Sequence, residues 1–172
     1  MKFDLDLSIA ILERTPLLLE SWLRDLPDEW VSANEGEDTW SPYDILGHFV
    51  HGEHTDWIPR ARIILSDRAD KTFEPFDRFA QFGESQTQSL DELLATFKKL
   101  RAENIAALKS FKLAADDFLK PGVHPELGPV NLEQLLATWV VHDLDHLSQI
   151  TQVMARQYKG LVGPWEEYLG IL

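Results

Sequence analysis

The sequence contains no cysteine among its 172 residues. Disulfide bonds, thiolate metal ligands and cysteine nucleophiles are therefore excluded, and any metal ion must be bound by His, Asp or Glu. If the chemistry of this protein involves a thiol, that thiol must come from outside the chain.

Positive charge is also scarce. The chain has 29 acidic and 16 basic residues, which gives a formal net charge of −13 at pH 7. A surface this acidic repels phosphate backbones and anionic lipid headgroups, so we expect neither a nucleic acid nor a membrane as a partner. The short basic patch Lys98–Arg101 is typical of a solvated helix face.

Long apolar runs are missing as well. No stretch approaches the roughly 20 apolar residues that a membrane-spanning helix requires, and the segment Met1–Asp6 lacks the apolar core of a signal peptide. We therefore expect a cytoplasmic protein. The length, without an internal repeat or linker, predicts a single domain over residues 1–172.

Helical periodicity is what the sequence does have, in four segments. The predicted helices run from about Leu5 to Leu26, from Ser41 to Leu65, from Ser89 to Lys112 and from Asn131 to Tyr158. Ser41, Ser89 and Asn131 are the expected N-caps of the last three. Pro16 predicts a kink or a late start in the first helix, whose core stripe we expect to be Leu7, Ala10, Ile11, Leu18, Trp22 and Leu26. The stripe of the second helix is expected to be Ile45, Phe49, Glu53, Trp57, Arg60 and Ile64.

The connections complete the predicted fold. Residues 68–88 are expected to form a loop whose phenylalanines, at positions 73, 76, 79 and 82, fold back as a lid or join a subunit contact. Lys120–Pro129, with three prolines and two glycines, is predicted to be a second loop. A short closing helix is expected near Pro164–Leu169. Since no strand pattern competes, the fold class is all-α, an up-and-down four-helix bundle with a short C-terminal helix.

His142 and His146 are the clearest chemical signal in the sequence. Their spacing of four residues places both imidazoles on one helix face, about one turn apart, and they occupy positions where the apolar stripe should carry Leu or Ile. Two neighbouring buried imidazoles without partners are costly, and a shared cation would remove that cost. Two ordinary core histidines bonded to neighbours are the alternative interpretation.

A third histidine strengthens the metal hypothesis. His48 lies one turn into the second predicted helix, which can face the fourth helix in a bundle. Three histidines without a fourth protein ligand are typical of a site with an open position. His51 is a rival ligand, His54 is expected on the outer face, and His124 either packs in its loop or lines the mouth of the site. Imidazoles suit a divalent transition metal, Zn or Ni in the first place and Co, Fe or Mn otherwise, better than Ca or Mg.

Ligand imidazoles usually donate their second N–H to a neighbouring acceptor. Glu53, Asp145 and Gln149 are the candidates for this orienting role. For Glu53 the alternative is an internal ion pair with Arg60 or Arg62. For Asp145, and for Asp143 beside it, the alternative is a solvated helix face.

Two other metal sites do not fit the sequence. A di-iron carboxylate bundle needs Glu-x-x-His on two helices, and that pattern is absent from the chain. A zinc protease needs His-Glu-x-x-His, whereas the second position here is Asp143.

The segment Trp40–His48, followed by Glu53 and Trp57, resembles the second-helix motif of the DinB-like superfamily. The segment Leu135–Ile150 resembles the fourth-helix motif, and the resemblance extends over nearly the whole chain. It implies a four-helix bundle, often a homodimer, with a three-histidine metal site at His48, His142 and His146. Branches of known activity are metal-dependent thiol transferases that use bacillithiol, mycothiol or glutathione.

The sequence thus supports three hypotheses with the same ligands. In the first, the metal activates a low-molecular-weight thiol that attacks a small electrophile. In the second, the cation only locks two helices of a non-catalytic stress or interaction protein. In the third, the metal serves hydrolysis.

Overall fold

The structure is a computed structural model that describes residues 1–77, 79–85 and 87–172, without the side chains of residues 81, 84 and 85. In this part of the chain the α-helices are α1 (Leu5–Leu12), α2 (Thr15–Leu23), α3 (Asp28–Ser32), α4 (Pro42–Thr55), α5 (Trp57–Leu65), α6 (Ala80–Ser85), α7 (Leu90–Ser110) and α8 (Leu132–Arg156). The 3-10 helices are η1 (Ala115–Leu119), η2 (Lys159–Leu161) and η3 (Gly163–Tyr168), and the strands are β1 (Pro121–His124) and β2 (Gly128–Asn131).

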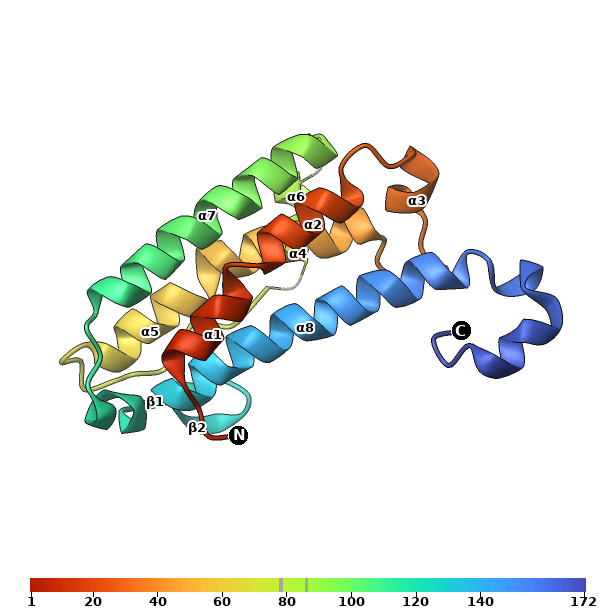
Figure 1. Ribbon diagram of the computed structural model, residues 1–172. Helices are drawn as coiled ribbons and strands as arrows, with labels where there is room; N and C mark the ends of the chain where they lie inside the picture. The colour runs from red at the N-terminus through yellow and green to blue at the C-terminus, as the bar shows by residue number, and fades with distance from the viewer. Residues whose placement is uncertain (78, 86) are drawn as a thin grey trace.

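The four members of the bundle are α1–α2, α4–α5, α7 and α8 (Figure 1). The predicted all-α four-helix bundle with a short C-terminal helix is confirmed. The bundle members do not alternate strictly in direction as the predicted up-and-down order requires, because α4–α5 and α7 run side by side in the same direction (Figure 1). Phe49 contacts Phe97, and further along both helices Glu53 contacts Arg101. The described residues between α5 and α7 make this order possible, since they return the chain along the bundle (Figure 1).

The first member is kinked as predicted, but its core stripe differs from the prediction. Leu7, Ile11 and Leu18 are 55 %, 37 % and 49 % exposed. The buried apolar side chains are Ile9, Leu12, Pro16, Leu19 and Leu23. This segment carries two apolar stripes at helical spacing, and periodicity alone does not tell which of them faces the core.

The second member begins where predicted and then breaks. The Ser41 side chain accepts the Asp44 backbone N–H, and the Asp44 carboxylate accepts the Ser41 N–H, which fixes the start of α4. The helix was predicted to continue to Leu65, but it is interrupted at Asp56, whose φ is −100° and ψ −75°. Pro59 explains the break, because a proline has no N–H for the carbonyl of residue 55.

The segment Lys120–Pro129 was predicted to be a loop, and that prediction was wrong. Residues 121–131 form a β-hairpin in which Val123 pairs with Pro129. The turn is held by the ring of His124, whose Nδ1 accepts the backbone N–H groups of Glu126 and Leu127 at 3.2 Å. The Phe73 backbone extends the hairpin by donating to the Val123 carbonyl. Short strands rich in proline and glycine give no alternating pattern for sequence analysis to detect.

Residues 68–88 fold back towards α4, and the described part includes the helix α6. Phe73 is buried, Phe76 contacts the ring of His48, and Phe79 is 67 % exposed. The position of residue 78 and that of residue 86 lie outside the described residues. The aromatic segment therefore covers the histidine-bearing face of α4.

Two apolar clusters form the core. One surrounds Trp57 and Trp139, and the other surrounds Phe49 and Phe97. Arg101 lies where they meet, with its guanidinium 4.9 Å from the Phe97 ring and 5.2 Å from the Trp139 ring. In the described part of the chain, no helix is long and apolar enough to span a membrane.

Candidate metal centre

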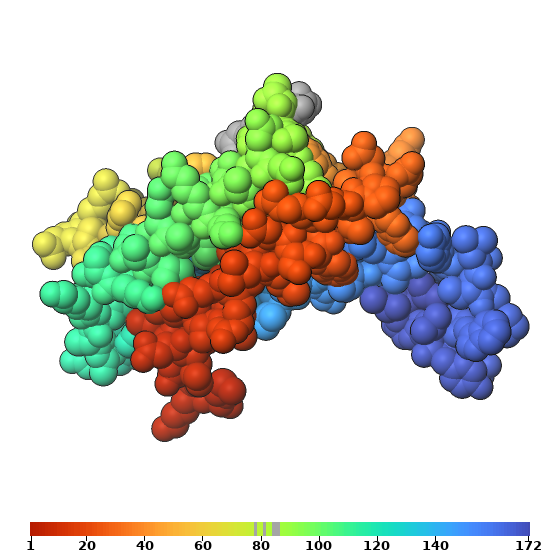
Figure 2. Space-filling view, turned by 45° about the horizontal axis from the view of Figure 1, so that its top comes forward, coloured from red at the N-terminus to blue at the C-terminus, as the bar shows by residue number. Residues whose placement is uncertain are grey.

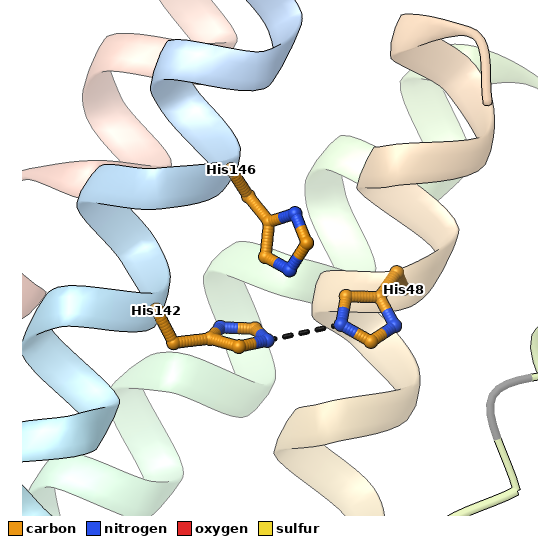
Figure 3. Close-up of side chains that lie close together, drawn as sticks. All are labelled: His48, His142 and His146. Atoms are coloured by element: carbon orange, nitrogen blue, oxygen red, sulfur yellow. Dashed lines mark hydrogen bonds between the residues drawn. The ribbon is translucent and has the colours of Figure 1, made fainter. Parts of the chain in front are cut away.

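Three histidines from two bundle members meet at the interface between α4 and α8. Nε2 of His48 lies 2.9 Å from Nε2 of His142, and the rings of His142 and His146 are 4.3 Å apart between centroids. Figure 3 shows the His48 ring pointing from α4 towards the two rings of α8. Each of the three residues offers one ring nitrogen, and these three nitrogens all lie within 4.8 Å of one another. The structure therefore brings together the three residues predicted as ligands.

Secondary structure sets this meeting point. His142 and His146 leave consecutive turns of α8, whose start is fixed by the cap between Asn131 and Gln134. His48 projects from the second turn of α4, whose start is fixed by Ser41. The site is thus built on rigid helices rather than on loops.

Aromatic side chains enclose the histidines. The Trp40 ring lies 5.0 Å from the His48 ring and 6.3 Å from the His146 ring. Trp57 lies 5.1 Å from the His142 ring, edge to face. Such an apolar wall limits the access of water and strengthens electrostatic interactions inside the site.

The electrostatics of His142 suit a metal ligand. Burial, together with the nearby His146, His48 and Arg101, lowers the pKa of His142 to about 2. The ring is therefore neutral at physiological pH, as a ligand imidazole must be. Its Nδ1 is buried and lacks a hydrogen-bond partner in the described part of the chain. These observations show a donor set of a kind that can hold a metal ion.

Gln149 lies where it can accept a hydrogen bond from the ring of His146. Its Oε1 is 2.7 Å from Nδ1 of His146. With the proton on Nδ1, the ring donates to Gln149 and keeps the lone pair of Nε2 for a ligand bond. The Gln149 side chain can therefore fix both the orientation and the tautomer of His146.

Glu53 and Asp145, the other two predicted orienting residues, lie elsewhere. The Glu53 carboxylate is buried and accepts hydrogen bonds from Arg101 Nε at 2.9 Å, from Asn104 at 2.9 Å and from Trp139 at 3.2 Å. Asp145 is exposed on α8. The ion pair expected for Glu53 does exist, but with Arg101 rather than with Arg60 or Arg62, because α7 and not α5 faces this carboxylate.

Asp143 was expected on a solvated helix face, and that prediction was wrong. Its side chain is fully buried, and both its oxygens accept hydrogen bonds from Arg101, at 2.6 and 2.9 Å. Arg101 also donates to the Leu12 carbonyl at 2.8 Å. Charge periodicity on one helix does not reveal a cation on another helix, so the role of Arg101 could not be predicted from the pattern around Asp143.

The three histidines line a cavity of about 350 Å³. Its other walls are Trp40, Asp56, Arg60, Phe76, His124, Pro125 and Glu126. Trp40 and His146 also border a second hollow, of about 670 Å³, together with Phe79, Phe82 and Gln149. The histidine group therefore opens towards two spaces that can hold small molecules.

The remaining histidines take different places. His51 is buried, and its ring lies 5.0 Å from that of Phe76. His54 is exposed, as predicted. His124 lines the cavity of the three histidines while its Nδ1 holds the hairpin turn.

The model of the DinB superfamily matches residues 11–150 of the chain. No curated protein sequence matches it.

Two solved structures share the fold. The first is described as "YfiT from Bacillus subtilis is a probable metal-dependent hydrolase with an unusual four-helix bundle topology". It has a TM-score of 0.76 and 21 % sequence identity, and the match covers 91 % of this chain and 89 % of that chain. The second is TT2238, described as a four-helix bundle protein, with a TM-score of 0.57 and 22 % identity over 86 % of this chain and 98 % of that chain.

Proposed function

The chain belongs to the DinB superfamily, and on this basis we propose that it is a metal-dependent enzyme that transfers a low-molecular-weight thiol to a small electrophile. His48, His142 and His146 would hold one divalent transition metal ion. Zn and Ni are the first candidates, with Co, Fe and Mn as alternatives.

The observation that carries this proposal is the position of the three histidines on the wall of a cavity. A purely structural ion would need a closed site with four protein ligands. In the described part of the chain the group has three members, and it faces space for a further molecule. This arrangement supports a catalytic site over the non-catalytic alternative.

A divalent ion held there supplies positive charge that lowers the pKa of a thiol or of a water molecule. The chain's own residues provide the setting. Neutral imidazoles leave that charge uncancelled, and Gln149 orients His146. Trp40 and Phe76 shield the site from bulk water. Since the chain has no cysteine, the thiol must be a second substrate.

Hydrolysis is the second candidate function. It would use the same three histidines, with water in place of the thiol. The description of YfiT as a probable metal-dependent hydrolase, on a fold with a TM-score of 0.76, favours it. At 21 % identity this likeness concerns the fold, so the reaction has to be decided by assay.

The deciding assay compares two reactions of the metal-loaded protein. An aryl chloride with glutathione or bacillithiol tests transfer, in which a C–S bond forms, the C–Cl bond breaks, chloride leaves and the thiol proton goes to solvent. A nitrophenyl ester without thiol tests hydrolysis. Activity in the first reaction that is lost in His142→Ala/His146→Ala and kept in His54→Ala supports the transferase. Activity in the second alone identifies a hydrolase, and activity in neither rejects catalysis on these substrate classes.

We also propose a homodimer. Apolar side chains of α1 and α8 are exposed side by side, among them Ile11, Val141 and Leu144. Beyond α8 the chain leaves the bundle as a separate lobe (Figure 2), whose Leu161, Trp165 and Tyr168 are 70–80 % exposed. Patches of this kind on a small protein are typical of interfaces.

A two-fold dimer formed through α8 would cover both the exposed apolar side chains of α1 and α8 and the lobe that follows α8. The groove between α1 and α8 borders the N-terminal half of α8, whereas the lobe follows its C-terminal end. An antiparallel arrangement of two α8 helices would therefore bring each lobe near the groove of the other copy, with the same contacts made twice.

A further inference from the structure

The cavity of the three histidines contains a buried ion pair that the proposed function does not use. Arg60 is only 8 % exposed, and its Nη2 lies 2.7 Å from Oδ1 of Asp56. Both residues line the cavity together with His48, His142 and His146. A buried arginine beside a candidate catalytic site needs a physical reason, because burying a cation is costly unless its donors are used.

The guanidinium is only partly satisfied by the protein. One face rests on the Phe73 ring, at 5.4 Å from its centroid, and one nitrogen pairs with Asp56. In residues 1–77, 79–85 and 87–172, Asp56 is the only ion-pair partner of the Arg60 side chain, and neither Nη2 of Arg60 nor Oδ1 of Asp56 has a hydrogen-bond partner. A guanidinium carries five N–H donors, so the donors on Nε and Nη1 remain for a ligand.

The surroundings of Arg60 favour a small anion. The cavity, at about 350 Å³, has the volume of a small-molecule pocket. Among its lining residues the acids are Asp56, which is paired with Arg60, and Glu126 at the hairpin turn. The charge of a bound divalent ion would outweigh that of Glu126, so the cavity would attract anions in spite of the net charge of −13.

The planar fork of an arginine matches a carboxylate, with two parallel hydrogen bonds. Asp56 fixes the orientation of that fork, and Phe73 supports its flat face. We propose that Arg60 binds the carboxylate of the small substrate or of the thiol whose reactive end lies at the three histidines. This inference rests on the proposed function, and it names a small carboxylate as the ligand class of that site.

The test uses two thiols of equal length, 3-mercaptopropionate and 3-mercapto-1-propanol, which differ only in the carboxylate. Each is titrated by calorimetry or NMR into metal-free and metal-loaded protein. Wild type is compared with Arg60→Met and with Arg62→Met. Arg62 is the matched control, because it lies two residues away on α5, is exposed and borders a different hollow.

The expected result is that wild type and Arg62→Met bind the acid roughly tenfold more tightly than the alcohol, with and without metal, and that Arg60→Met shows no preference. Equal binding of the two thiols by wild type, or an unchanged preference in Arg60→Met, would overturn the inference. The proposed function is tested separately by the metal dependence. If metal increases the affinity for neither thiol, the function fails, while the acid-to-alcohol ratio in metal-free protein still decides the role of Arg60.

Arg60→Met leaves Asp56 buried without its partner and can therefore unfold. Asp56→Asn/Arg60→Met removes both charges together, and its thermal melt shows whether it is folded. A folded double variant with no acid preference supports the inference, and one that retains the preference overturns it. Arg60→Lys keeps the charge but not the fork, so its preference should fall below that of wild type.

Discussion

Asp143 follows His142 directly in the sequence, yet its carboxylate does not join the histidine group and instead accepts two hydrogen bonds from Arg101, of 2.6 and 2.9 Å. Glu53 of α4 binds the same guanidinium. Arg101 thereby ties α4 and α8 to α7 within one turn or two of His48 and His142. The buried charges fix how far each helix is rotated, and the rotation brings the histidine rings together.

The first prediction concerns this cluster. Arg101→Met should lower the free energy of unfolding by about 3–5 kcal/mol, because it leaves two carboxylates buried without a cation. Urea unfolding followed by circular dichroism measures the loss. The control is Lys109→Met, at another position of α7, which breaks the exposed ion pair between Lys109 and Glu13. It should change the free energy of unfolding only slightly. A similar loss of stability in both variants would contradict the prediction, because the loss could then not be assigned to the buried carboxylates.

The second prediction concerns metal content. The purified protein, without a histidine tag, should contain about one divalent transition metal ion per chain, since three imidazoles lie within bonding reach of one position. Elemental analysis should show that this ion is absent from His142→Ala/His146→Ala. His54→Ala, which removes an exposed imidazole from α4, should retain it. A wild type that takes up no ion even from added metal salts would reject the metal centre.

Local sequence signals were sufficient for the bundle and for the histidine group. The helix starts at Ser41, Ser89 and Asn131 are set by side chains three residues away, so they can be read from the sequence alone. The same holds for His142 and His146, whose shared face follows from helical geometry. His48 could be added because its apolar neighbours indicate a core-facing position.

Contacts between side chains of different helices could not be predicted from the sequence. The partner of Glu53 lies 48 positions away on α7, and nothing in the local pattern distinguishes Arg101 from Arg60 as that partner. Asp56 was overlooked, although it directly precedes α5 and its spacing of four residues from Arg60 is a usable signal. The hairpin was missed because its short strands, rich in proline and glycine, show no alternating pattern, and the backbone bonds of Lys71 and Phe73 that extend it come from far away in the sequence.

The third prediction concerns pH. Burial raises the pKa of Asp56 to about 6, although Arg60 and His51 act to lower it. The unfolded chain therefore loses this proton at lower pH than the folded protein does, and the stabilisation that Asp56 contributes below pH 3.8 is lost as the pH rises to about 6. Between pH 4 and 7 the metal-free wild type should lose on the order of 3 kcal/mol relative to Asp56→Asn.

Urea unfolding across this pH range tests the prediction. Asp145→Asn is the control, because it removes an exposed carboxylate from α8. If the difference between wild type and Asp56→Asn stays constant with pH, the carboxyl is not perturbed by burial.

The fourth prediction concerns Gln149. Gln149→Leu removes the acceptor from Nδ1 of His146, so the ring can adopt the wrong tautomer or rotate. We expect metal affinity to fall by roughly 10-fold to 100-fold, as measured by competition with a chelator. Gln152→Leu makes the same change three residues further along α8 and should leave the affinity close to that of wild type. An equal effect of both substitutions would assign the loss to general damage of the helix.

The fifth prediction concerns the dimer. Light scattering behind size-exclusion chromatography should give twice the 19.7 kDa mass of the chain. Val141 and Leu144 are 63 % and 50 % exposed on α8, so Val141→Glu/Leu144→Glu costs a monomer little but places two pairs of like charges in a two-fold interface. This variant should be monomeric, with an unchanged circular dichroism spectrum. Ala95→Glu, at an exposed position of α7, should remain dimeric. A wild type that is monomeric at all concentrations would show that α8 and the lobe after it are not covered by a second copy.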